Sequence, residues 1–336
     1  MKKFLASIIA VVLAVSGLSV ISITANAATI FISGNYEYTV NSDDTVNIAG
    51  YKGIATDITI PSQILNKNVV KISANSFYNN STLTSVKMPN TIKVVGSMAF
   101  HNCIKLSKVT LPSNLKEIGY NAFDGTTALT TITIPKTVTK AGIDVFNGSA
   151  LKTATIENGA TAVADNIFSN AKNLTKVTIP NTVKKVGSMS FYGCKSLSSV
   201  TLPNTLTEIG YSAFENCQAM KSITIPKNVT YFGTTAVGYS DGRVIDGFII
   251  YGYKNTKAQT YATKNKITFK ALQEETVPVG DINNDGKIDV SDVTYLQMYL
   301  SGNSSYVIKN TKAADANGDG KIDVADVTKI QTIIAS

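Results

Sequence analysis

Apolar residues recur at one fixed interval through the middle of the chain. A phenylalanine returns every 23 residues, with a single step of 22, and a leucine or methionine keeps the same interval. A unit of that length is too small to bury its own apolar face, whereas units stacked in register form continuous apolar columns. The pattern therefore predicts a solenoid. The two columns are Phe77, Phe100, Phe123, Phe146, Phe168, Phe191 and Phe214, and Leu83, Leu106, Leu129, Leu151, Leu174, Leu197 and Met220.

Each unit has the same internal order, as in residues 106–128, "LSKVTLPSNLKEIGYNAFDGTTA". A short strand ends at a proline, and a second apolar pair, a glycine turn and an Ala-Phe pair follow. The proline recurs at positions 89, 112, 135, 180, 203 and 226, and Glu157 stands in the gap. The repeat resembles the leucine-rich repeats of the BspA type over roughly residues 50 to 240. That resemblance implies a β-rich right-handed solenoid with short helical turns, which we expect over residues 61–240.

The two ends of the array are expected to carry caps, because a stack must protect its terminal apolar faces. Residues 36–51, "YEYTVNSDDTVNIAGY", alternate with period 2 around a polar turn and predict a β-hairpin. We therefore assign residues 28–60 to an N-terminal hairpin cap. Residues 247–272 predict a strand, a short helix and a strand, and we assign residues 241–272 to a C-terminal cap.

Strand positions that lie between buried ones should point outward, and in most units they are Thr, Ser or Lys. Such a face is either a flat binding surface or simply a row of residues that suit a half-exposed strand. No aromatic residue interrupts it, so it lacks the stacking platform usual for sugar binding. The outward pairs are Ser85 and Lys87, Lys108 and Thr110, Thr131 and Thr133, Thr153 and Thr155, Lys176 and Thr178, Ser199 and Thr201, and Ser222 and Thr224.

Two acidic loops of twelve residues follow near the end of the chain, "DINNDGKIDVSD" at 281–292 and "DANGDGKIDVAD" at 315–326. Oxygen ligands at positions 1, 3, 5, 7, 9 and 12 wrap one hard cation, and a glycine at position 6 allows the sharp turn. Gly286 and Gly320 occupy that position. The spacing predicts one Ca²⁺ in each loop, two ions in all, and the alternative is a pair of solvated acidic turns. The expected ligands are Asp281, Asn283, Asp285, Lys287 (through its carbonyl), Asp289 and Asp292, and then Asp315, Asn317, Asp319, Lys321 (through its carbonyl), Asp323 and Asp326.

A helical pattern follows each loop, but none precedes the first. The stretch "QEETVPVG", with Pro278 and Gly280, predicts a linker, which we place at residues 273–279. The predicted helices carry their apolar residues at helical spacing. These residues are Val293, Leu296, Tyr299 and Leu300 after the first loop, and Val327, Ile330, Ile333 and Ile334 after the second.

The duplicated loop and helix of residues 280–336 resemble the type I dockerin family. The resemblance implies a small all-α calcium-binding dockerin-like domain that docks into a cohesin domain of a scaffold protein. In that family, loop positions 10 and 11 centre the partner contact. Many members have a Ser-Thr pair there, and this sequence departs from it, so the identity of the cohesin stays open. The corresponding partner-binding residues are Val290 and Ser291, and Val324 and Ala325.

Residues 1–27 predict a secretory signal peptide. Lys2 and Lys3 precede an apolar run, and small residues surround the expected cleavage point after Ala27. A retained membrane anchor is the alternative. No other segment is expected to span a membrane, so we expect a secreted protein, held at the cell surface or in an extracellular complex through its dockerin-like domain.

The charge of the chain is unevenly distributed. The formal charge is +8, and removal of Lys2 and Lys3 with the signal peptide leaves +6. Residues 280–336 hold eight acids and five lysines, a net −3, so residues 28–279 carry +9 (6 + 3). Arg243 is the only arginine and no base-reading motif is present, so we expect no nucleic-acid partner. The lysines serve solubility or contact with anionic wall material.

Catalysis finds little support in the residues. His101 is the only histidine, and the acids of the repeat are scattered over regular turns, so we expect no enzyme and no catalytic residue. Cys103, Cys194 and Cys217 share one position of the repeat. We interpret them as small apolar fillers, with a Cys194–Cys217 disulfide as the alternative.

These parts predict a secreted, non-catalytic component of an extracellular polysaccharide-degrading complex. The dockerin-like domain would bind the scaffold, and the solenoid would serve as a surface for adhesion or for an unidentified protein or glycan ligand. One alternative is a polysaccharide-binding module that takes part in polysaccharide catabolism. Another is a regulator or inhibitor of the enzymes of the complex.

Overall fold

The computed structural model describes residues 29–273, 278–308 and 310–336. The expected signal peptide of residues 1–27 and most of the expected linker lie outside the described residues. The chain divides into two compact units, Met1–Leu272 and Gln273–Ser336, and each is described by itself. Within the described residues, every helix is too short or too polar to cross a lipid bilayer.

The first unit begins with a small antiparallel sheet. Strands β2 (Tyr36–Val40) and β3 (Val46–Tyr51) form the hairpin that the alternating pattern predicts, and β1 (Phe31–Ser33) pairs with β2. Tyr38, Val46 and Ile48 are buried beneath it. Because β3 also pairs in parallel with β6 (Lys67–Ile72), the hairpin continues directly into the stacked turns.

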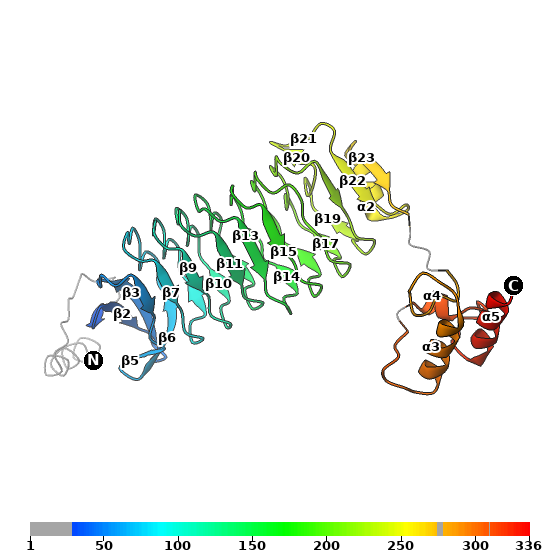
Figure 1. The fold of residues 1–336 in the computed structure, drawn as a ribbon. Coiled ribbons are helices and arrows are strands. Elements are labelled where there is room, and N and C mark those ends of the chain that lie inside the picture. Colours follow the sequence, from blue (N-terminus) through cyan, green and yellow to red (C-terminus); the bar gives the residue numbers. More distant parts are fainter. Residues whose placement is uncertain (1–28, 274–277, 309) are drawn as a thin grey trace. The chain divides into compact units, whose positions relative to one another are not determined.

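Parallel strands join consecutive turns of the solenoid along two sides (Figure 1). We call the first side the strand side, since its strands carry the outward threonines and lysines. Its sheets have the orders β4-β7-β9, β11-β13-β15 and β18-β22-β23, so no hydrogen-bonded ladder joins β9 to β11, and residues 197–203 form no strand. The bounds are β4 (Asp57–Thr59), β7 (Ser85–Lys87), β9 (Lys108–Thr110), β11 (Thr131–Ile134), β13 (Thr153–Ile156), β15 (Lys176–Thr178), β18 (Ser222–Thr224), β22 (Ile249–Gly252) and β23 (Thr268–Ala271).

The second side, which we call the opposite side, is built from strands of two residues in most turns. They pair in the orders β6-β8-β10-β12 and β14-β16-β17-β19, and the short strand β5 (Gln63–Ile64) pairs with β6. Turns rather than α-helices connect the two sides throughout residues 61–240. The bounds are β8 (Val94–Val95), β10 (Glu117–Ile118), β12 (Lys140–Ala141), β14 (Ala162–Val163), β16 (Lys185–Val186), β17 (Glu208–Ile209) and β19 (Tyr231–Phe232).

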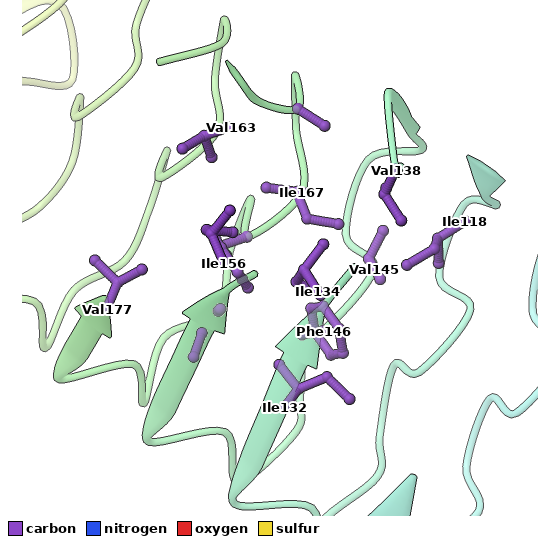
Figure 2. Close-up of a cluster of buried hydrophobic side chains, with 14 of the residues drawn as sticks. Ile118, Ile132, Ile134, Val138, Val145, Phe146, Ile156, Val163, Ile167 and Val177 are labelled. Atoms are coloured by element: carbon purple, nitrogen blue, oxygen red, sulfur yellow. The ribbon is translucent and has the colours of Figure 1, made fainter. Parts of the chain in front are cut away.

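The phenylalanine column forms the core that the sequence predicts. Each ring is at most 2% exposed, and neighbouring ring centroids lie 4.9 to 5.9 Å apart. Aliphatic side chains from both sides fill the remaining interior, where Ile134, Phe146 and Ile156 lie together (Figure 2). Because each turn packs on the next, one continuous core runs through the array.

Close stacking of the turns explains a column of glycines on the opposite side. A Cβ placed on any of them would come within 2.3 to 2.6 Å of a backbone nitrogen in the preceding turn. No side chain fits at that distance, so the residue must be glycine for the turns to approach this closely. The column consists of Gly96, Gly119, Gly142, Gly187, Gly210 and Gly233.

The cysteines lie in a buried slot of the repeat that most turns fill with a small side chain. All three are free thiols, and Cys103 Sγ donates to the carbonyl of Phe77 at 3.1 Å. In other turns the slot holds Thr126 and Ser149, whose hydroxyls donate to the carbonyls of Phe123 and Phe146. Ala171, which has no side-chain donor, occupies the same buried position after Phe168, so the slot selects for small size rather than for a donor.

The first unit ends in a strand, a helix and a strand, as expected. Helix α2 (Lys257–Lys264) lies between β22 and β23 and buries Ala258 and Ala262. A small hairpin of β20 (Tyr239–Ser240) and β21 (Arg243–Val244) precedes them. Glu215 holds this hairpin against the preceding turns, because its buried carboxylate accepts hydrogen bonds from Ser212, Thr235 and the Gly242 nitrogen.

The second unit contains helices α3 (Val290–Leu300), α4 (Thr311–Ala314) and α5 (Val324–Ile334). Val293 and Leu296 of α3 pack with Val327 and Ile330 of α5 in a small core of their own. The predicted helices are present, but Tyr299 and Ile334 are exposed because no further segment of the unit covers the ends of the helices.

Candidate calcium-binding and docking site

Both acidic loops adopt the sharp turn that the spacing predicts. Gly286 and Gly320, at position 6, have φ angles of +87° and +83°. An added Cβ would meet nothing within 4 Å at either position, so the backbone conformation rather than space calls for glycine there. Each loop leads directly into a helix, α3 or α5.

In the first loop, two buried carboxylates organise the backbone. Asp281 accepts hydrogen bonds from the nitrogens of Asp285 and Gly286, both at 3.1 Å. Asp292 is fully buried and accepts from Ile282 at 2.7 Å and from Asn283 at 3.1 Å. Asp281 thus ties the start of the loop to its central turn, and Asp292 ties the end of the loop back to its start.

The loops also begin the helices that follow them. Asp289 accepts from the nitrogen of Ser291, and Asp292 accepts from the nitrogen of Asp289, which completes a capping box at the start of α3. The hydrogen bonds from Ser291 lower the pKa of Asp289 from its ordinary value. Asp323 and Asp326 repeat this box at the start of α5.

The second loop differs from the first at its first residue. Asp315 accepts from the Gly320 nitrogen through Oδ2 at 2.9 Å, but its buried Oδ1 has no hydrogen-bond partner. Buried polar atoms of native proteins nearly always have a partner, and an unpaired carboxylate oxygen is costly. A cation bound in the loop would supply the missing partner for Asp315 Oδ1.

The donor set fits calcium. Among the residues that the structure describes, no lysine or arginine pairs with the buried carboxylates of Asp281, Asp292 or Asp326. The same residues include no group of three or more His, Cys, Asp or Glu side chains arranged as a metal centre, and most hydrogen bonds that the loop carboxylates accept come from backbone nitrogens. Buried carboxylates at this spacing, without cationic partners, suit a hard divalent cation that takes oxygen ligands.

Comparison with known families accounts for both units. The model of the BspA type leucine-rich repeat region matches residues 54–175 and 161–243, in six copies, and these ranges together span more than half of the chain. The type I dockerin domain matches residues 279–334.

The chain belongs to the BspA-type leucine-rich repeat proteins. It carries a type I dockerin domain at residues 279–334. Both are protein-interaction modules that are typically non-catalytic, and proteins that contain them are typically extracellular or at the cell surface. A dockerin domain implies a cohesin partner and generally binds calcium.

Solved structures show similarity to the same fold. A leucine-rich repeat protein from Bacteroides ovatus is 25% identical with a TM-score of 0.50, covering 72% of this chain and 67% of that one. One from T. pallidum is 25% identical with a TM-score of 0.48, covering 71% and 97%. A leucine-rich cell surface protein from Faecalibacterium prausnitzii is 22% identical with a TM-score of 0.46, covering 75% and 97%. Among curated proteins, no sequence matches the chain.

The expected docking positions of the dockerin domain lie on its surface. Val290 and Val324 are 72% and 71% exposed, and Ser291 and Ala325 beside them are exposed as well. A valine this exposed contributes little to its own domain, so both side chains are available to a partner. Val307, 59% exposed in the same domain, was not singled out from the sequence because it lies outside both loops and both helical patterns.

The strand side of the repeat protein presents the expected polar face. A shallow pocket of about 530 Å³ opens on it where β9 and β11 are not hydrogen-bonded, and Thr131, Thr133 and Thr155 are among its lining residues. No aromatic side chain lines this pocket. The face offers hydroxyl groups and the Glu157 carboxylate to a ligand.

The histidine of the repeat protein lies in a column of turn residues. His101 stacks on Tyr78 with ring centroids 5.0 Å apart, and its Nδ1 lies 3.3 Å from Asp124 Oδ2. Burial raises the pKa of Asp124 from its ordinary value, although His101 nearby opposes that shift. The contacts of His101 join neighbouring turns.

Proposed function

We propose that this protein is an exported, non-catalytic subunit of an extracellular polysaccharide-degrading complex. It would dock through its calcium-loaded dockerin domain on a cohesin of the scaffold. The observation that carries the proposal is the duplicated loop and helix. Each copy combines a buried carboxylate at position 12, which has no lysine or arginine partner among the described residues, with an exposed valine at the first position of the helix.

Calcium would act by making the docking domain fold. Bound in the loops, it would neutralise carboxylates that otherwise repel one another in a unit with a very small core. Asp281, Asn283, Asp285, the Lys287 carbonyl, Asp289 and Asp292 would hold the first ion. Asp315, Asn317, Asp319, the Lys321 carbonyl, Asp323 and Asp326 would hold the second.

The solenoid would supply the recognition surface of the subunit. Its strand side is long, polar and regular, which suits adhesion or contact with another protein of the complex. A polysaccharide-binding role is the second candidate, and the threonine-lined pocket on the strand side favours it over a role as an enzyme inhibitor.

Binding to a panel of immobilised cohesins tests the proposal. The mature full-length protein should bind at least one cohesin in millimolar calcium and lose that binding in excess chelator. Replacing both position-12 ligands, Asp292→Ala with Asp326→Ala, should abolish binding, whereas Asp246→Ala, at an exposed acid outside the loops, should leave it intact. Binding that persists in chelator or in the double variant would refute the calcium-dependent docking.

A further inference from the structure

One turn of the solenoid departs from the pattern that lets the turns stack closely. From Phe146 to Leu151 the chain is one residue shorter than from Phe123 to Leu129, and Ala164 stands where neighbouring turns have glycine. A Cβ at that position of the other turns would meet backbone at 2.3 to 2.6 Å. The methyl group of Ala164 therefore prevents its turn from approaching the preceding one as closely.

Backbone hydrogen bonds are missing at this place. Gly142 donates to the Ile118 carbonyl at 2.8 Å and Gly187 to the Val163 carbonyl at 3.0 Å, but Ala164 has no corresponding bond to Ala141 within the described residues. Strands β12 and β14 are accordingly not paired. We call this gap between Gly142 and Ala164 the seam.

The seam continues into the turn that holds the phenylalanines. Phe123 and Phe168 donate their amides to the next turn, at 2.9 Å each, whereas the Phe146 amide has no such partner among the described residues. The Phe146 and Phe168 rings are also 5.9 Å apart, the widest step in the column. On the strand side, by contrast, β11, β13 and β15 remain fully paired, so the opening is confined to one side.

A pocket of about 410 Å³ lies at the seam on the opposite side. Tyr120, Lys140, Ala141, Asp165 and Asn166 are among its lining residues. The Tyr120 side chain is 45% exposed, and Asp165 is fixed in place by a hydrogen bond from the Ser188 nitrogen at 2.8 Å. The pocket thus combines an aromatic ring with fixed polar groups and with the Ala141 carbonyl, which has lost its ladder partner.

We propose that this pocket binds one or two rings of a neutral polysaccharide. A sugar ring has an apolar face that packs on an aromatic side chain, here Tyr120, and hydroxyls that both donate and accept hydrogen bonds. Unpaired backbone groups at the seam need such partners, and Asp165, Asn166 and Lys140 offer further ones. The volume lies within the range of small-ligand sites.

The same observations disfavour other ligand classes. A peptide strand would need a long free edge, and β12 offers only Lys140 and Ala141. A polyanionic glycan would be repelled by the carboxylates of Glu117 and Asp165, and the single positive charge of Lys140 beside them would not cancel that repulsion. The site lies on the solenoid, so the proposal is independent of docking through the dockerin domain.

Titration calorimetry of the full-length protein with three hexasaccharides tests the proposal. The probes are hexamers of β-1,4-linked glucose, β-1,4-linked xylose and α-1,4-linked glucose. At least one should bind, and Tyr120→Ala should weaken that binding about tenfold or more, since a lost ring contact of this kind is worth about one order of magnitude.

Tyr211 provides a matched control. It occupies the same position in another turn and is 53% exposed, but it does not line the pocket at the seam. Tyr211→Ala should therefore leave glycan binding unchanged. All variants should bind the cohesin like the parent, which separates failure of this site from failure of docking.

A second variant tests the role of the seam. Ala164→Gly should let the turns close, weaken glycan binding and leave the thermal midpoint of the solenoid unchanged or higher. The proposal is overturned if no hexasaccharide binds at millimolar concentration, or if Tyr120→Ala and Ala164→Gly both bind like the parent. Binding of an extended peptide in place of glycans, abolished by Tyr120→Ala, would also overturn it.

Discussion

Val290 and Val324 occupy the same position in the two halves of the dockerin domain and are exposed to almost the same extent, 72% and 71%. Aligned from Asp281 and Asp315, the halves share 12 of 20 residues. Calcium binding alone would conserve the ligands but not the shared valines. We infer that each half presents a similar surface to the cohesin and that the domain docks in either of two orientations.

Charge substitutions at these valines test the two orientations. Val290→Asp alone and Val324→Asp alone should each leave most of the cohesin affinity, because the other surface stays usable. The double variant should abolish binding. Val307→Asp, at an exposed valine outside the loops, serves as the control and should have little effect. Loss of binding in one single variant, with none in the other, would mean that only one orientation is used.

Calcium removal should unfold the dockerin domain and spare the solenoid. The eight acids of residues 280–336 repel one another without cations, and the buried Asp315 Oδ1 has no other partner. Excess chelator should remove the helical circular dichroism of α3 and α5, and calcium should restore it. A helical signal that is insensitive to chelator would show that the loops are not metal sites that control folding.

The phenylalanine column should be the most sensitive element of the solenoid. Phe123 is fully buried between Phe100 and Phe146, so Phe123→Ala should lower the free energy of unfolding by about 3 to 5 kcal/mol. The exposed Thr133 of β11 is the control, and Thr133→Ala should cost less than about 1 kcal/mol. Chemical denaturation in calcium measures both, and equal effects would contradict the assignment of the core.

The three thiols should be unreactive in the folded protein. Burial raises the pKa of Cys103 and of Cys217 to about 12 and that of Cys194 well above its ordinary value, so the reactive thiolate is scarce at pH 8. Alkylation followed by mass spectrometry should label none of them in native protein and all three in denaturant. Rapid labelling of the native protein would show that the turns open readily.

Protonation of Asp124 in mild acid should stabilise the solenoid. Burial raises the folded-state pKa of Asp124 above its unfolded value, so its charged form destabilises the fold at neutral pH. That penalty is relieved as pH falls through the folded-state pKa toward the ordinary value. The thermal midpoint of Asp124→Asn should therefore exceed that of the parent by more at neutral pH than at pH 4. A difference that is constant with pH would contradict this.

Spacing alone predicted much of the molecule. The 23-residue interval predicts the solenoid and its phenylalanine core because a repeat can be recognised in the sequence without knowing which residues are in contact. The glycines at position 6 of the two loops likewise predict the sharp turns at Gly286 and Gly320. The exposure of Tyr299 was not predictable, since helical spacing marks an apolar face but not whether another segment covers it. The hydrogen bond from Cys103 was not predictable either, because its acceptor is a carbonyl 26 residues away in the sequence. The seam was not predictable because it depends on the distance at which the methyl group of Ala164 holds two neighbouring turns apart.

The one-sided opening at Ala164 also leads us to expect that the solenoid bends most easily there. Elsewhere along most of the array, ladders on the opposite side and bonds between the turns tie neighbouring turns together, whereas across the seam the ties are concentrated on the strand side, in β11, β13 and β15. Two segments, one ending after the fourth phenylalanine and one beginning before the fifth, are thus joined mainly through β11, β13 and β15. We expect bending compliance to be concentrated at that point, so that the solenoid behaves as a jointed rod rather than as a uniform spring.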